Sequence, residues 1–267
     1  MAKWSYDITG AEIIMRDVPV YDAATIAAGE FIMKGTSDPD AGADEGISFV
    51  TGYDATAANQ CIDALGISLE TVTTSSSPSI ASAYSTTTGP CYAKAIINPF
   101  AVYMVEQSLA AADDVAITST AAATLTVGGL QDDIDGCHVY FPLSAAGVKG
   151  SLRLLIAAAA GSATMDSALV ANGTGADTIV LISAPNQYSL PLIADGTKVG
   201  SGACDTTYKA ATNIRILETL IDRDAGLELL TPAKFNGINN LHLVKGGNGP
   251  KVFYKVMLKD HIFGLQE

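Results

Sequence analysis

Hydrophobic residues occur along this chain in short runs that end at clusters of Gly, Asn, Asp or Ser. Runs rich in Val, Ile, Thr, Tyr and Phe with such boundaries are typical of β-strands, and long stretches with a helical period are few. The pattern therefore predicts a mainly β protein. Its predicted strands include residues 11–15, 30–34, 46–51, 93–97, 123–127, 138–141, 152–157 and 177–183.

The clearest predicted element is a hairpin near the end of the sequence. Residues 241–244 and 251–259 flank Lys-Gly-Gly-Asn-Gly-Pro, which is favourable turn chemistry. One face of the second strand carries Val252, Tyr254, Val256 and Leu258, and the other carries lysines together with Phe253 and Met257. Because this other face is only partly polar, we expect it to lie beside another domain or subunit.

Two short helices are also compatible with the pattern. Asp54 is placed to cap a helix over residues 55–65, in which Ala58, Cys61, Ile62 and Leu65 repeat at helical spacing and Gly66 follows as a C-terminal stop. Residues 211–221 fit a helix or a strand equally well, since short apolar runs do not settle that choice.

A Ser- and Thr-rich stretch, residues 71–89, lacks charged residues and has the composition of a linker. We therefore predict two β-barrel- or sandwich-like domains. Residues 1–90 form an N-terminal arm and a small β-barrel that end in this linker, and residues 91–267 form a larger β domain with the C-terminal hairpin.

The chain is acidic, with a formal net charge of −13 over 267 residues. Binding of phosphates needs clustered Lys and Arg, so this charge argues against a nucleic-acid partner. The most apolar run, residues 154–161, is far shorter than the roughly 20 residues of a membrane span. The first residues lack the apolar core of a signal peptide. We expect a protein made in the cytoplasm, with no membrane partner.

The four cysteines are too far apart in sequence to form a CxxC pair for zinc or redox chemistry. They are Cys61, Cys91, Cys137 and Cys204. We interpret them as small buried residues in a reducing compartment, with a disulfide as the alternative.

One segment, residues 129–141, concentrates chemical groups: Asp132, Asp133, Asp135, Cys137 and His138 lie within seven residues. The spacing does not match a calcium loop of the EF-hand type, because Gln and Pro stand where the first and last oxygen ligands belong. Adjacent Cys and His side chains point to opposite faces of a strand, which does not suit zinc.

This segment is best interpreted as an acidic turn between two strands. Two alternatives stay open, a weak or subunit-shared cation site and a metal-dependent hydrolase that would use Asp132, Asp133, Asp135 and His138. The remaining histidines, His242 and His261, are distant in sequence, and no nucleophile elbow or phosphate loop occurs. The sequence therefore predicts no catalytic, cofactor-binding or metal-binding residues and no enzymatic activity.

The segments VPVYDAATIAAGEFIMKGT (18–36) and CIDALGISLETV (61–72) resemble the small β-barrel units of tailed-bacteriophage capsid decoration, or cement, proteins. Those families open with an extended arm, continue with a strand introduced by a Gly-acidic pair, here Gly29-Glu30, and later have a Gly-aliphatic-x-Leu strand, here residues 66–69. This strand conflicts with the helix that we predict to end at Gly66.

The resemblance implies a virion protein that binds the outer surface of the capsid, commonly as a homotrimer, and clamps neighbouring major capsid subunits together. It implies no catalysis. The arm would bear Trp4 and Tyr6, with Trp4 either a binding anchor or a hydrophobic plug within its own subunit. The alternatives are a tail or head-completion component and a carbohydrate- or host-surface-binding β module.

Overall fold

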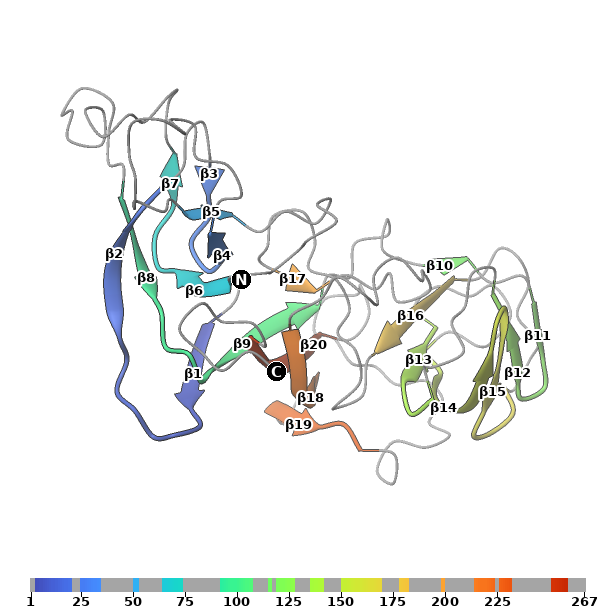
Figure 1. The fold of residues 1–267 in the computed structure, drawn as a ribbon. Coiled ribbons are helices and arrows are strands. Elements are labelled where there is room, and N and C mark those ends of the chain that lie inside the picture. The colour runs from blue at the N-terminus through green and yellow to red at the C-terminus, as the bar shows by residue number, and fades with distance from the viewer. Residues whose placement is uncertain are drawn as a thin grey trace. The chain divides into compact units, whose positions relative to one another are not determined.

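A computed structural model describes a large part of the chain. Strands make up most of the described residues, and no helix occurs among them. Two of the sheets curl into half-barrels (Figure 1). The predicted mainly β class, with barrel- or sandwich-like domains, is therefore confirmed. The described residues are 3–20, 25–34, 50–52, 64–73, 92–107, 115–116, 119–127, 135–141, 150–169, 178–182, 198–199, 214–223, 226–231 and 251–258.

The chain divides into two compact units. Unit 1 comprises Met1–Val105, Leu192–Lys198 and Met257–Glu267, and unit 2 comprises Glu106–Pro191 and Val199–Val256. The chain passes from unit 1 into unit 2 within strand β9 (Ala101–Gln107). The boundary that the sequence predicts near residue 90 falls in residues 74–91, outside the described residues.

The main sheet of unit 1 is antiparallel, in the order β2-β8-β6-β4-β5 (Figure 1). One face of this sheet buries Val18, Ile32, Leu65, Ala93 and Ala95 in a common core. Strands β3 and β7 form a separate antiparallel pair, and β1 pairs with β9 at the end of a six-stranded sheet. The strands are β1 (Lys3–Asp7), β2 (Met15–Pro19), β3 (Thr25–Ile26), β4 (Phe31–Lys34), β5 (Val50–Gly52), β6 (Ala64–Ser68), β7 (Val72–Thr73) and β8 (Tyr92–Ile96).

The helix predicted over residues 55–65 is wrong at its described end, because Ala64 and Leu65 belong to strand β6. Residues 53–63 lie outside the described residues. Gly66 does not end a helix but sits within β6, opposite Ile32 of β4, next to a bulge in the ladder. A β-carbon on Gly66 would lie 1.8 Å from the carbonyl oxygen of Ile96, so the site accepts only glycine.

The strand predicted over residues 11–15 is largely wrong, since β2 begins at Met15 and residues 11–14 precede it. The Asn98 side chain accepts a hydrogen bond from the Ile14 amide and donates one to the Glu12 carbonyl. These two backbone groups therefore bond to a side chain and not to a neighbouring strand. By contrast, the strands predicted at 30–34 and 93–97 are confirmed by β4 and β8.

Unit 2 contains a seven-stranded sheet in the order β10-β16-β13-β14-β15-β12-β11. It confirms the strands predicted at 123–127, 138–141, 152–157 and 177–183. Strands β14 and β15 form a hairpin that Gly161 closes with a positive φ of 81°. The strands are β10 (Val115–Ala116), β11 (Ser119–Ala121), β12 (Thr124–Thr126), β13 (His138–Tyr140), β14 (Leu152–Ala159), β15 (Ser162–Met165) and β16 (Thr178–Ile182).

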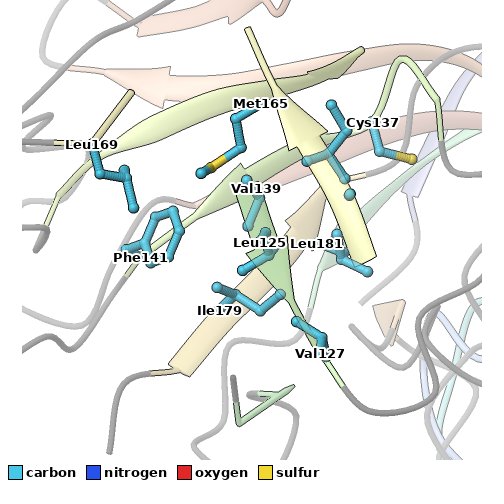
Figure 2. Packing of buried hydrophobic residues seen from close by; sticks show 11 residues of the cluster. Leu125, Val127, Cys137, Val139, Phe141, Met165, Leu169, Ile179 and Leu181 are labelled. Carbon is cyan, nitrogen blue, oxygen red and sulfur yellow. The ribbon is translucent and has the colours of Figure 1, made fainter. Parts of the chain in front are cut away.

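One face of this sheet forms the core of unit 2, where Phe141, Val139, Leu125, Met165 and Ile179 converge (Figure 2). In β13 and β16, the residues on the opposite face are buried as well, including Tyr140 and Val180. A strand that is buried on both faces has a continuous apolar run in its sequence. This explains why apolar and polar residues do not alternate in these two strands.

Arg153 is the largest fully buried side chain among the described residues. Its guanidinium donates hydrogen bonds to the carbonyl oxygens of Leu152, Ser167 and Ala168 at 2.9 to 3.2 Å. Burial lowers the pKa of Arg153, and the charge of Asp166 opposes that effect. The buried guanidinium thus fixes the chain that follows β15.

The last described strands are β18 (Ile214–Arg223), β19 (Gly226–Leu229) and β20 (Val252–Leu258), with β18 between the other two. The chain passes from unit 2 back into unit 1 within β20, after Val256. Residues 211–221, which fit a helix or a strand, therefore form a strand from Ile214. In β20, the alternation is as predicted, with Val252, Tyr254, Val256 and Leu258 buried and the intervening residues half-buried. The predicted partner strand 241–244 lies outside the described residues.

Two side-chain contacts tie β20 into unit 2. The Tyr254 hydroxyl donates to the Gln107 side-chain oxygen at 2.6 Å, and the Gln107 amide donates to the Leu181 carbonyl at 2.8 Å. On the other face, Lys255 forms a 2.7 Å ion pair with Glu218 of β18. The buried polar groups of Gln107 are therefore satisfied within the unit.

Candidate functional site

The segment that concentrated chemical groups in the sequence does not form a metal centre in its described part. Asp135 is exposed at a turn, whereas Cys137 is buried in the unit 2 core and His138 is buried in β13. Asp132 and Asp133 lie outside the described residues. Among the residues that the structure does describe, no group of three or more His, Cys, Asp or Glu side chains is arranged to hold a metal ion.

His138 is nevertheless an unusual interior group. Its Nε2 atom is buried without a hydrogen-bond partner. Burial lowers the pKa of His138 to about 4, although the charge of Asp166 acts in the opposite direction. The imidazole is therefore neutral in the folded protein at neutral pH.

This burial predicts a specific dependence of stability on pH. Since the pKa of His138 is about 4 in the folded state and about 6.5 when unfolded, the unfolded chain binds the proton more tightly. Stability should be complete above pH 6.5 and fall toward pH 4, with a contribution approaching about 1.4 kcal/mol per pH unit. Urea unfolding of the wild type and His138→Leu across this range measures it. An unchanged slope in the variant would contradict the prediction.

The described residues do not include the remaining cysteines and histidines of the sequence, which are Cys61, Cys91, Cys204, His242 and His261. Among the described segments, none forms a helix with the length and apolarity that crossing a bilayer requires.

The most distinctive surface feature is an apolar loop in unit 1, which we define as residues 8–15. Ile8, Ile13, Ile14 and Met15 are all exposed, Ile8 to 53% and Met15 to 50%. Tyr6, at the end of β1, is also exposed. This stretch holds more of the exposed large hydrophobic residues than any other described segment of similar length. Such a concentration of exposed apolar side chains makes the loop a candidate interaction surface.

Buried polar groups hold the apolar loop in place. The Asn98 amide nitrogen donates to the Glu12 carbonyl at 2.8 Å and to the Asp7 carboxylate at 3.3 Å, and the Asn98 side-chain oxygen accepts from the Ile14 amide at 2.7 Å. The same Asp7 carboxylate accepts from the Thr9 amide at 2.8 Å. The loop backbone is thus fixed at both ends by two side chains that are almost fully buried.

The electrostatics of Asp7 fit this role. Burial raises the pKa of the Asp7 carboxyl, but hydrogen bonds from Thr9, Asn98 and Ala11 outweigh burial, so its pKa lies below the ordinary value. The carboxylate therefore stays charged and bonded at neutral pH. Nearby, burial and the Asp7 charge raise the pKa of the Tyr103 hydroxyl, which has no hydrogen-bond partner.

Residues 3–7, which the resemblance assigned to an extended arm, form strand β1 and pair with β9 of the same chain. The Trp4 ring packs edge-to-face on Tyr103 at 6.4 Å, and Phe31 packs on the same Tyr103 ring at 5.5 Å. Trp4 is half-buried and packs within its own unit, which favours the second of the two roles considered for it.

The apolar loop is continuous with the interior of unit 1. Across the ladder, Phe31 of β4 lies opposite Ile67 of β6, which lies opposite Ile96 of β8, which lies opposite Met15 of β2. The first three are buried, and Met15, on the last strand of the sheet, is exposed. A row of core side chains thus reaches the surface at this edge.

Sequence reasoning missed this site. A signal was present in the three consecutive apolar residues 13–15 between Glu12 and Arg16, which a half-buried strand would not place in a row. Comparisons of the chain with protein-family models, with curated proteins and with solved structures find no match.

Proposed function

We propose that this chain is a structural protein of a tailed-bacteriophage virion. In this proposal it binds the outer capsid surface and stabilises contacts between major capsid subunits, as a homotrimer. The observation that carries the proposal is the apolar loop, in which exposed aliphatic side chains stand on a backbone fixed by Asp7 and Asn98. A preordered apolar surface loses little entropy when a partner covers it.

The binding free energy expected from covering the apolar loop suits a protein that acts in many copies. Covering the half-exposed side chains of Ile8, Ile13, Ile14 and Met15 is worth about 1 kcal/mol each. A few kcal/mol per copy is modest, but a shell that binds many copies gains their sum. The acidic net charge of −13 keeps so crowded a surface soluble.

The two segments behind the resemblance also support the proposal. Gly29-Glu30 directly precedes β4, and residues 66–68 lie in β6. These strands are neighbours in one antiparallel ladder, and the Gly29 amide bonds to the Ser68 carbonyl at 2.7 Å. A strand introduced by a Gly-acidic pair and a Gly-aliphatic strand thus occur together, as the resemblance implies for a small barrel.

The proposal is tested with a triple variant, Ile8→Ser, Ile13→Ser and Met15→Gln. Because these side chains are exposed, the fold should survive, whereas binding to shells depleted of this chain should weaken about a hundredfold, from the loss of about 3 kcal/mol. Co-sedimentation with such shells measures the affinity.

The matched control is Ile156→Ser in unit 2, since Ile156 is similarly exposed, to 54%, and lies outside the apolar loop. It should bind shells as the wild type does. Equal binding by the triple variant and the wild type would refute the role of the apolar loop.

A further inference from the structure

The outer edge of β19 in unit 2 presents backbone groups that pair with no other described strand, in a defined pattern. Leu230 donates its amide to the Thr219 carbonyl at 2.9 Å, so residues 226, 228 and 230 bond to β18. In an antiparallel ladder, bonded and non-bonded pairs alternate. The N–H and C=O groups of Leu227 and Leu229 therefore point away from β18, toward the edge of the sheet.

The side chains of the same two residues are also accessible. Leu227 and Leu229 are each 45% exposed and share one face of β19, while Glu228 lies on the other. Among the described strands, β19 ends its sheet. Residues 226–230 contain no Lys or Pro, and their ladder to β18 has no bulge, so the usual protection of an edge is weak.

We infer that β19 is a strand-addition site that accepts an extended segment of a partner protein with aliphatic residues on either side of a Lys or Arg. Such a strand would bond to the outward groups of Leu227 and Leu229 and lay its aliphatic side chains against theirs. The register then places its middle residue opposite Glu228, where a basic side chain is favoured. This site belongs to unit 2 and does not depend on the apolar loop.

The charge pattern disfavours a second copy of the chain as the occupant. In the symmetric antiparallel register that uses both leucines, Leu227 of one copy pairs with Leu229 of the other. This register therefore sets Glu228 directly opposite Glu228. Like charges directly opposite one another destabilise a ladder, and each copy already carries a net charge of −13. A basic partner strand removes both penalties.

The probe is the peptide acetyl-Ser-Thr-Val-Lys-Val-Thr-Ser-amide, added to the full ¹⁵N-labelled chain and followed by NMR. We expect saturable shifts at the Leu227 and Leu229 amides, and slower hydrogen exchange of both. Replacing the peptide Lys with Gln should weaken binding about two- to fivefold, and replacing it with Glu should weaken binding further. In the Glu228→Gln variant, the preference for Lys should disappear.

Two controls distinguish strand addition from nonspecific binding of the peptide. A peptide with Pro in place of either Val should not bind, because each Val amide is a donor in the added ladder and Pro has none. The double variant Leu227→Lys and Leu229→Lys should keep its fold, since both residues are exposed, and should lose peptide binding. Absence of binding at millimolar peptide, equal binding of the Pro peptide, or shifts confined to other residues would overturn the inference. So would self-association of the chain through residues 226–230.

Discussion

Replacing Gly66 with Ala is expected to unfold unit 1 or to destabilise it by about 4 kcal/mol or more. The added β-carbon would lie 1.8 Å from the carbonyl oxygen of Ile96 and 2.9 Å from the carbonyl carbon. Both atoms belong to the backbone of β8, so relief requires β6 and β8 to separate. The free energy of unfolding of the variant, from urea titration followed by circular dichroism, measures the effect.

Gly10→Ala is the matched control. Gly10 also has a positive φ, 76°, but nothing lies within 4 Å of the position of its β-carbon. Gly10→Ala should therefore lose only the stability that a positive φ costs a residue with a β-carbon, about 1 to 2 kcal/mol. Equal losses for the two variants would mean that backbone conformation, and not the contact with Ile96, makes Gly66 necessary.

Replacing Asn98 with Ala should have the second-largest effect, with a loss of about 3 kcal/mol of stability. The variant leaves the Ile14 amide, the Glu12 carbonyl and one oxygen of Asp7 without their partner. The Ile14 amide should then exchange with solvent much faster, since its bond to Asn98 is the one that protects it. Thermal unfolding and hydrogen exchange measure the two effects.

The variant Asn98→Asp gives this prediction a sharper form. It sets a second carboxylate beside Asp7, so the variant should be least stable at neutral pH and should recover as one of the two carboxyls is protonated. The wild type should instead lose stability as the pH falls below 4. Because the pKa of Asp7 is lowered in the folded state, the stability that Asp7 contributes is present above pH 4 and is lost as the pH falls further. A pH-independent loss in Asn98→Asp would show that Asp7 and Asn98 are not coupled.

Strands with strong local patterns could be predicted from the sequence. The alternation in β20 and the apolar runs of β13 and β16 follow from burial on one face or on both, which the residues themselves encode. At Gly66 the local pattern misled, because Ala58, Cys61, Ile62 and Leu65 repeat at helical spacing before a glycine. The deciding contact is with the Ile96 carbonyl on another strand, and no local window contains it.

The candidate site was harder to predict for the same reason. Asn98 is separated by 84 residues from Ile14 and by 91 residues from Asp7, so their bonds are invisible to any reading of neighbouring residues. The segment around His138 drew attention because its chemical groups are adjacent in sequence. In the fold, Cys137 is buried in the core and the His138 Nε2 atom has no hydrogen-bond partner. Residues that are adjacent in sequence therefore do not form a common site here.

The central claim is that this chain covers a virus shell in many copies, and its copy number tests that claim most directly. Quantitative mass spectrometry of purified particles gives the ratio of this chain to the major capsid protein. The account predicts a ratio near that of a shell component, and a lower ratio for the triple variant of the apolar loop. A few copies per particle would identify a tail or head-completion component instead, and a chain found only free in solution would contradict the account.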